Sequence, residues 1–310
     1  MTKNNILTHD IKQVLGCRND NYYFPSELNE YCVNNTRRPC NEHRWAILNK
    51  VITEIGQSLA NGINYNDVTL MNIIRGELNK INKNNIDMII DSLKSLKFTN
   101  ENHYAMLANE LIIKSMNDSV SISQHDRLNK CDMTPTDIYV NVAVAFIDFS
   151  EQNKTTEVSF KNILSQRCNI FFKGFIDENM KMDENNQHRV KNYKGFMNMI
   201  ASLYCAKCFN CDIVNNCIDK ITKIIVKQNN FSDIEKDNYY SGLDKLIIKL
   251  YDKFDADESN EDFCKIYEVL QKSYEMIDNV INTDKPQLRK YMRSVHAQNV
   301  SKLKKIKEKY

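Results

Sequence analysis

The sequence predicts an all-α fold, on the strength of three observations. Seven Gly and four Pro occur among 310 residues, whereas these two types usually make up about an eighth of a globular chain. Folds that depend on frequent tight turns, such as sandwiches, small barrels and propellers, are therefore disfavoured. From residue 42 onward, segments with a helical apolar period follow one another with short polar breaks. Strand-like alternation is nearly absent, since the one brief case, at 141–146, lies within a longer helical stretch.

The first expected helix, 43–60, has its apolar residues on one side and Gly62 just past its end. It includes Trp45, the only Trp of the chain, which we assign to the core. The segments of helical period that follow are 65–81, 84–98, 104–116, 134–149, 160–176, 193–209, 213–227, 239–254, 261–281 and 287–309. Pro135 suits the first turn of its helix, because proline lacks the N–H that would be unpaired there.

The expected helices group into pairs of roughly 35 to 50 residues, the period of HEAT-type repeats. Each pair can bury its apolar stripe only against its neighbours. The sequence therefore predicts a HEAT-type α-solenoid of about five antiparallel hairpins over 42–310, interrupted by polar breaks at 117–133, 177–191 and 252–262. Residues 1–41 are expected to form a partly extended N-terminal arm, with one amphipathic turn at 7–15.

Several function classes are not indicated by the sequence. No glycine pattern fits a dinucleotide or P-loop phosphate cradle, and the six His form no known catalytic or zinc motif. We therefore expect no enzyme and no cofactor. There is no apolar run of 18 residues, and ten Cys without a leader are typical of reduced intracellular thiols, so we expect a cytoplasmic protein. The Asn-, Lys- and Ile-rich composition is typical of AT-rich coding genomes, such as those of protists and large DNA viruses.

One cysteine cluster, Cys205-x2-Cys208-x2-Cys211 with Cys217 beyond, resembles a zinc or iron–sulfur motif. On one helix, however, the first three thiols would fan over about 120° rather than converge on an ion. We interpret these residues as buried helical cysteines and expect no metal. A metal-binding protein or enzyme built on this cluster is the alternative from another functional class.

Five segments, in order, resemble the middle domain of eukaryotic translation initiation factor 4G. They are RGELNKI at 75–81, HYAMLANELIIKSM at 103–116, VSFKNILSQRC at 158–168, GFMNMIASLY at 195–204 and QLRKYM at 287–292. The resemblance covers roughly residues 65–300. It implies a fold of five stacked helical hairpins without catalytic activity, which binds RNA and the two lobes of a DEAD-box RNA helicase of the initiation factor 4A type. Relatives of this family act in nonsense-mediated mRNA decay, splicing and nuclear cap binding, and these branches remain alternatives.

The resemblance also implies which residues contact the helicase. The matching positions are Asn79, Lys80 and Asn82 for one lobe, and Arg289, Lys290 and Arg293 for the other. The alternative for the first group is that Asn79 and Lys80 simply end a helix, where a cation is favourable at the negative end of the dipole. The alternative for the second group is a solvated helix face. Arg167 and Cys168 are expected to support packing between repeats.

The C-terminal end of the chain is basic and is a candidate RNA-binding surface. Its cations are Lys302, Lys304, Lys305, Lys307 and Lys309. A basic helix suits RNA phosphates or an acidic partner, and the alternative is a solvated terminal helix.

A cap-binding protein (initiation factor 4E type) is a further candidate partner, because initiation factor 4G binds it through a Tyr-x4-Leu-Φ motif (Φ, apolar). Tyr65-x4-Leu70-Met71 matches that pattern but falls on an expected solenoid helix, so we assign Leu70 and Met71 to the core. The N-terminal arm carries degenerate versions of the motif, at His9, Val14 and Leu15 and at Tyr23 and Leu28. Together these observations predict a translation initiation scaffold that binds and activates a helicase.

Overall fold

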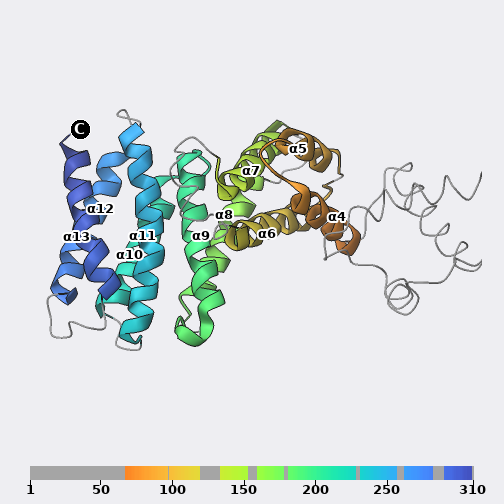
Figure 1. Ribbon diagram of the computed structural model, residues 1–310. Helices are drawn as coiled ribbons and strands as arrows, with labels where there is room; N and C mark the ends of the chain where they lie inside the picture. Colours follow the sequence, from red (N-terminus) through yellow and green to blue (C-terminus); the bar gives the residue numbers. More distant parts are fainter. Residues whose placement is uncertain are drawn as a thin grey trace, which may run out of the picture. The chain divides into compact units, whose positions relative to one another are not determined.

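The computed structural model describes residues 67–96, 98–118, 133–152, 159–177, 181–227, 231–256, 262–281 and 290–308 (Figure 1). All of its regular elements are helices, which confirms the all-α prediction for the described part of the chain. The chain forms two compact units, Met1–Lys80 and Ile81–Tyr310. The expected helix 43–60, with Trp45, and the expected arm lie outside the described residues. None of the described helices is long and apolar enough to span a membrane.

The described part of the first unit is helix α4, Asp67–Lys80. Leu70 and Ile74 are fully buried, and Gly76 is also buried in the middle of this helix. Leu70 of the Tyr65-x4-Leu70-Met71 pattern therefore belongs to the core, as expected, whereas Met71 is only half-buried.

The second unit contains nine α-helices within the described residues. They are α5 (Ile86–Ser95), α6 (Glu101–Asp118), α7 (Pro135–Gln152), α8 (Phe160–Phe175), α9 (Gln187–Cys205), α10 (Cys211–Lys227), α11 (Asp233–Ala256), α12 (Phe263–Ile281) and α13 (Lys290–Lys307), with a short 3-10 helix η2 (Glu184–Asn186) before α9.

The helices of this unit pack mainly against the second helix along the chain. The odd-numbered helices form a row in which α5 packs against α7, α7 against α9, α9 against α11 and α11 against α13. Among the even-numbered helices, α6 packs against α8 and α10 against α12. Helices α9, α11 and α13 run side by side in Figure 1, and α6 crosses toward α9, against which it also packs. The helices of this unit therefore form two rows that share one interior.

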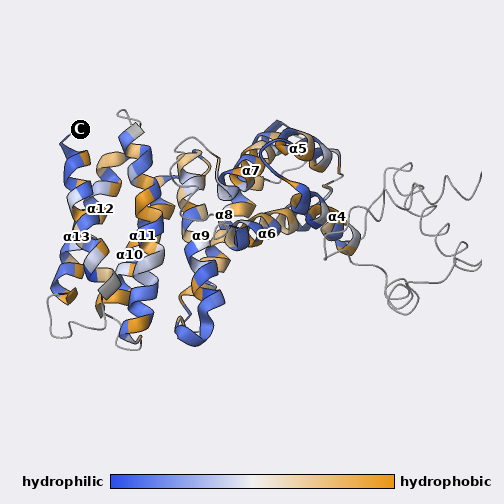
Figure 2. Cartoon of the chain, viewed as in Figure 1, coloured by the Kyte–Doolittle hydropathy of each residue, from blue (hydrophilic) through white to orange (hydrophobic). Residues whose placement is uncertain are grey.

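The interior is apolar and rich in aromatic side chains, and the polar residues of each helix lie mainly on its outer side (Figure 2). Phe98, Tyr104, Phe146 and Phe160 form one cluster of ring contacts between α6, α7 and α8, with ring centroids 5.0 to 6.0 Å apart. Rings at such distances in tilted or edge-to-face orientations stabilise the packing beyond the area they bury.

A second aromatic cluster joins α8, α9 and α11. The Tyr193 ring lies edge-on to Tyr239, with centroids 5.5 Å apart, and packs against Phe175. Both hydroxyls donate to backbone carbonyls, Tyr193 to that of Tyr239 at 3.2 Å and Tyr239 to that of Phe175 at 2.8 Å. Tyr193 fits because α11 carries Gly242 opposite its ring, where a Cβ atom would lie 2.1 Å from Tyr193 Cε1.

The expected break at 177–191 is wrong, because much of it is ordered helix. Asp183 Oδ1 accepts from the backbone N–H of Asn185 at 3.1 Å and so caps η2, which leads directly into α9 at Gln187. Met182 is fully buried. Capping of this kind supplies the partners that the first N–H groups of a helix lack.

Capping also explains why the expected C-terminus of helix 193–209 and the expected N-terminus of helix 239–254 are wrong. Helix α9 ends at Cys205 in a Schellman motif: Cys208 N–H donates to Leu203 O and Lys207 N–H to Tyr204 O, each at 2.9 Å. Helix α11 begins six residues earlier than expected, at Asp233, because Ser232 and Glu235 form a capping box. Its Ser-x-x-Glu signature is visible in the sequence.

The Gly242 contact generates the first prediction. Gly242→Ala should destabilise the protein by about 2 kcal/mol, because the new methyl group overlaps the Tyr193 ring in a packed interior. Gly174→Ala is the matched control: it is also a helical Gly→Ala change, but its Cβ would meet nothing within 4 Å, so we expect a gain of about 0.5 kcal/mol. Urea unfolding of both variants measures the difference, and equal stabilities would contradict this close contact.

The turn after α9 generates a second prediction. Lys207 has a φ of 62°, the left-handed conformation that costs a side chain about 1 kcal/mol relative to glycine. Lys207→Gly should therefore stabilise the protein by about that amount. As a control, Lys272→Gly in the exposed middle of α12 should destabilise it by about 1 kcal/mol. Thermal unfolding measures the midpoint temperature of each variant. Shifts of both midpoints in the same direction would contradict the left-handed conformation of Lys207.

Candidate partner-binding surface

The three residues matched to the first helicase contact have local roles at a helix end. Asn79 and Lys80 are exposed at the C-terminus of α4, and Lys80 Nζ lies 3.0 Å from Glu77 Oε1. In the second unit, Asn82 N–H donates to Asn85 Oδ1 at 2.7 Å, and its own Oδ1 accepts from Asn84 N–H at 2.9 Å. These contacts shape the turn before α5 and leave Asn82 exposed.

Of the residues matched to the second helicase contact, the structure describes Arg293 in full. Its guanidinium donates to the carbonyl oxygen of Ile281, the last residue of α12, at 2.6 Å. Carbonyl groups in the last turn of a helix have no hydrogen-bond partner within the helix. A cation near them also interacts favourably with the negative end of the helix dipole. Arg293 therefore fastens α13 to the end of α12. Arg289 and the side chain of Lys290 lie outside the described residues.

Arg189 makes the same kind of contact at another place and was missed by the sequence analysis. It is the third residue of α9, and it donates to the carbonyl oxygens of Gly174 and Phe175 at the end of α8. The sequence could have indicated both contacts, because Arg189 and Arg293 each lie in the first turn of a helix. A cation in the first turn of a helix is unfavourable to that helix's own dipole, so its presence there indicates a partner elsewhere.

The basic residues of α13 divide into two sets. Lys302 Nζ lies 3.3 Å from Asp252 Oδ1 and 5.4 Å from the centre of the Tyr251 ring, so this side chain is directed at α11. Lys307 Nζ lies 4.8 Å from the centre of the Tyr267 ring on α12. Lys304 and Lys305 are exposed. Lys307 is exposed as well, Lys302 is partly buried, and Lys309 lies outside the described residues.

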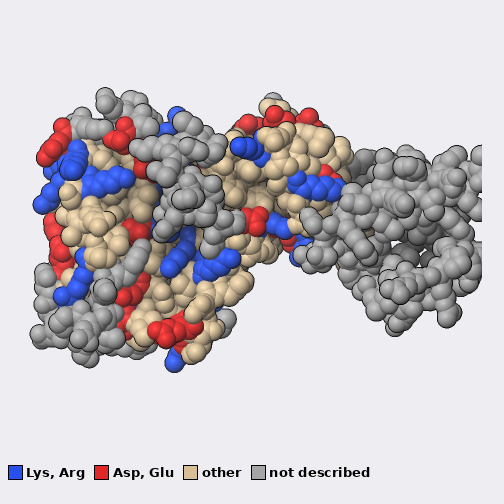
Figure 3. Space-filling model, in the orientation of Figure 1, with Lys and Arg blue, Asp and Glu red and all other residues tan. Residues whose placement is uncertain are grey.

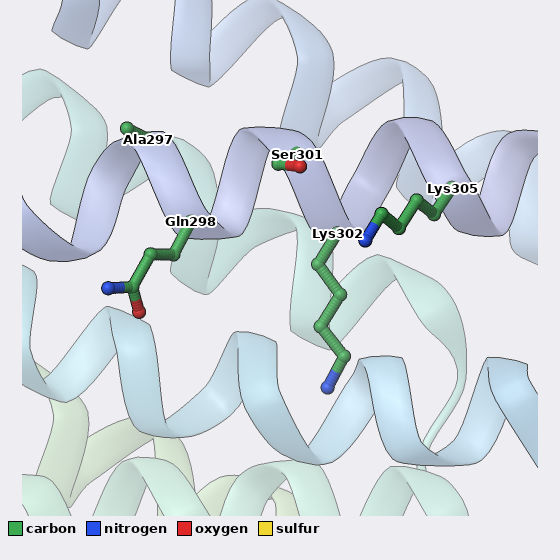
Figure 4. Close-up of a pocket in the computed structure, with 5 residues that line it drawn as sticks. All are labelled: Ala297, Gln298, Ser301, Lys302 and Lys305. Carbon is green, nitrogen blue, oxygen red and sulfur yellow. The ribbon is translucent and has the colours of Figure 1, made fainter.

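A shallow hollow runs along α13 beside these lysines. It is lined by Ala297, Gln298, Ser301, Lys302 and Lys305. In Figure 4, Gln298 and Lys302 extend from α13 toward the neighbouring helix, whereas Lys305 lies along α13. Figure 3 shows Lys and Arg side chains gathered at this end of the unit, with acidic side chains at their margin.

A buried polar network holds α13 in place. Asn299 Nδ2 donates to Asp244 Oδ1 on α11 at 2.9 Å, and the Tyr251 hydroxyl donates to Asn299 O at 2.9 Å. The hydroxyls of Tyr251 and Tyr274 lie 2.8 Å apart, which adds α12 to the network. Buried polar groups that are hydrogen-bonded in this way fix one helix arrangement, because any other would leave them unpaired.

His296 is the second fastening point of α13 and is 3% exposed. Its Nδ1 lies 3.0 Å from the Tyr240 hydroxyl, and its Nε2 lies 3.0 Å from Asp278 Oδ1. A hydroxyl, an imidazole and a carboxylate in this order resemble a catalytic triad. Tyr240, however, is fully buried, so its hydroxyl has no access to a substrate. The arrangement fastens three helices together. Burial lowers the pKa of His296, although Asp278 acts in the opposite direction.

The cysteine cluster lies at the turn between α9 and α10. Cys205 ends α9 and Cys211 begins α10, but Cys208 lies in the turn rather than on a helix, which corrects the helical interpretation. Cys208 is buried as the last residue of the Schellman motif, a position often occupied by an apolar side chain. Burial raises the pKa of both Cys205 and Cys208 to about 11, so both are thiols at neutral pH. Within the described ranges, no three His, Cys, Asp or Glu side chains are placed to hold a metal ion.

The residues proposed for a cap-binding protein, at 9–28, lie outside the described residues. Comparisons of the whole chain with protein-family models, curated proteins and solved structures found no match. The resemblance to initiation factor 4G therefore depends on its five motif segments.

The environment of His296 generates a third prediction. Because burial holds the pKa of His296 below its ordinary value of 6.5, the unfolded chain takes up a proton first as the pH falls. Stability should therefore decrease as the pH falls below about 6.5. Asp278→Asn removes the carboxylate that supports the imidazolium, so its loss of stability in acid should be steeper than that of the wild type.

The control for this prediction is His296→Gln, which removes the titrating group and should flatten the same pH dependence. Urea unfolding between pH 7 and about 5 measures all three proteins. Parallel curves for the wild type and His296→Gln would contradict the assignment of this histidine as neutral in the folded protein.

Proposed function

We propose that this protein is a non-enzymatic scaffold of the type formed by the middle domain of initiation factor 4G, acting in the cytoplasm in translation initiation. The observation that carries this proposal is the order of the five motif segments along the chain. They correspond to the end of α4, to α6, to the start of α8, to α9 and to the start of α13. Five segments that match one family in the same order along the chain are a stronger indication than any one of them alone.

The solenoid architecture is part of the proposal. Its support is the packing of each odd-numbered helix against the next odd-numbered one, together with the α6–α8 and α10–α12 contacts. Stacked hairpins pack in this way, because each helix buries its stripe against the equivalent helix of the next hairpin. The polar outer side of α13, with Ser294, Gln298, Ser301 and Lys305 exposed, suits a terminal helix that closes such an array.

The proposed mechanism is positional. A scaffold that binds both lobes of a DEAD-box helicase reduces the entropy lost when they close over RNA and ATP, and so raises turnover without touching the phosphates. Asn79, Lys80 and Asn82 would contact one lobe. Arg289 and Lys290 would contact the other, with Arg293 positioning α13. RNA would bind at the exposed Lys304, Lys305 and Lys307, joined by the partly buried Lys302 and by Lys309.

Binding of a cap-binding protein by residues 1–41 is a separate part of the proposal, and it depends on the degenerate motifs in that segment. A relative that works in mRNA decay or splicing would have the same architecture. It would be distinguished by the helicase that copurifies with it.

The fourth prediction tests the helicase contact. The double variant Arg289→Glu and Lys290→Glu should lose at least tenfold in affinity for a DEAD-box helicase of the initiation factor 4A type, equivalent to about 1.4 kcal/mol. Stimulation of the helicase's RNA-dependent ATPase should fall in parallel. The matched control is Lys265→Glu with Lys272→Glu, the same charge change on the exposed side of α12.

Copurification with mass spectrometry comes first, because it identifies the partners of the native protein. The absence of any helicase among them would overturn the proposed function. Equal loss of affinity in both double variants would show that total charge, rather than this contact, governs binding.

A further inference from the structure

One ion pair links two helices of the odd-numbered row that are not neighbours in it. Asp137 lies in the first turn of α7 and Lys249 in the second half of α11, and Lys249 Nζ lies 3.0 Å from Asp137 Oδ1. Helix α9 packs against both helices, whereas α7 and α11 make little direct contact within the described residues. The pair therefore joins the two helices that lie on either side of α9.

The Asp137 side chain is held in place by its own helix. Its Oδ2 accepts from the Thr134 hydroxyl at 2.7 Å, and its backbone N–H donates to the same hydroxyl oxygen at 3.2 Å, as in a capping box. The other carboxylate oxygen, Oδ1, accepts from Ser202 Oγ of α9 at 3.3 Å and from Lys249. Burial acts to raise the pKa of Asp137, but Lys249 and Thr134 together lower it, so the carboxylate is charged at neutral pH.

Further contacts bring the end of α9 to the same place. Asn198 Nδ2 of α9 donates to Thr136 Oγ1 at 3.0 Å, next to Asp137. The Cys205 thiol donates to the carbonyl oxygen of Lys249 at 3.9 Å, so the last residue of α9 lies beside α11. The start of α7, the C-terminal half of α9 and α11 thus meet in one polar clamp, formed by Thr136, Asp137, Asn198, Ser202, Cys205 and Lys249.

The α5–α8 part of this unit is joined to the α9–α13 part near both ends of α9. In the first half of α9, the Tyr193 ring packs against Phe175 of α8, whose carbonyl oxygen accepts from Tyr239 of α11. The polar clamp lies in the second half. Apolar burial is non-directional, whereas hydrogen bonds and ion pairs act at fixed positions. Figure 1 shows α9, α11 and α13 side by side and α7 inclined to them, so the row changes direction where the clamp lies.

We propose that the Asp137–Lys249 ion pair is a brace that sets the angle between the α5–α8 part and the α9–α13 part. Ion pairs between exposed side chains contribute little, because two long side chains must be ordered and water screens their charges. Here Thr134 has already ordered Asp137, and the Lys249 side chain is only 26% exposed. Without the charge of Lys249, α7 loses this link to α11, and the angle depends on the packing of α6, α7 and α8 against α9.

The brace also bears on the proposed scaffold, and this consequence rests on the proposed function. Asn82 precedes α5 and Lys290 begins α13, so these two helicase contacts belong to different parts of the unit. The angle between the parts sets the distance between the contacts. A scaffold saves its partner the entropy of closing only when it holds that distance fixed.

The fifth prediction tests the brace in the full chain, through residual dipolar couplings of the backbone N–H groups. In the wild type, couplings from the α5–α8 part and from the α9–α13 part should fit one common orientation. Lys249→Met removes the charge from an unbranched side chain. Each part of this variant should still fit by itself, but the common fit should be lost, because the angle is no longer fixed. Lys249→Arg keeps the charge and should keep the common fit.

The matched control is Lys223→Met, which breaks an exposed pair with Asp219 within α10 and should leave the common fit intact. An intact common fit in Lys249→Met would overturn the brace, and so would equal losses in Lys249→Met and Lys223→Met. Loss of the fit within either part of Lys249→Met would also overturn it, because the pair would then stabilise the fold of that part rather than the angle.

The helicase assay separates the brace from the proposed function. Lys249→Met should stimulate the RNA-dependent ATPase of the helicase less than Lys223→Met does. Equal stimulation by the two variants, with the common fit lost in Lys249→Met, would contradict the consequence for the scaffold while the brace stands. Wild-type protein that binds no helicase would overturn the proposed function and leave the result on the orientation of the two parts unaffected.

Discussion

The close contact between α9 and α11 at Gly242 is the constraint on which the second unit depends. Because this position has no side chain, the Tyr193 ring can lie against α11, and its hydroxyl reaches the carbonyl oxygen of Tyr239. Helix α9 also packs on α6 and α7, and α11 packs on α10 and α13. The Gly242 contact therefore sets the spacing between the two halves of the odd-numbered row.

The apolar period of the sequence was sufficient to locate the helices, and caps decided where they end. Expected and observed helices agree best at 160–176, where Ser159 accepts a hydrogen bond from Asn162 N–H just before the apolar run begins. They differ most at α9 and α11, where Asp183 and the Ser232–Glu235 box extend the helices into polar segments. A periodicity argument assigns polar residues to breaks, whereas hydrogen bonds to the first N–H groups keep such residues helical.

The candidate sites were harder to predict, because the sequence shows charge but not its direction. Arg293, Lys302 and Lys307 all belong to a basic C-terminal segment, yet they contact Ile281, Asp252 and Tyr267 of the same unit. Their positions depend on how α13 is rotated against α11 and α12. That rotation is set by the buried contacts of His296 and Asn299, which join residues about 55 positions apart in the chain. Local sequence carries no information on such pairs.

The basic residues of this unit thus serve two physical purposes, and burial separates them. Arg189 and Arg293 are partly buried against carbonyl groups that end a neighbouring helix, where an arginine can donate without a counter-charge. Lys194 is also partly buried, and burial and the charge of Lys245 lower its pKa while Asp244 acts in the opposite direction. An arginine that donates to the open carbonyl groups at the end of a neighbouring helix stabilises the packing of the two helices. Exposed cations such as Lys304 and Lys305 instead direct their charge to the solvent, where an anionic partner can meet it.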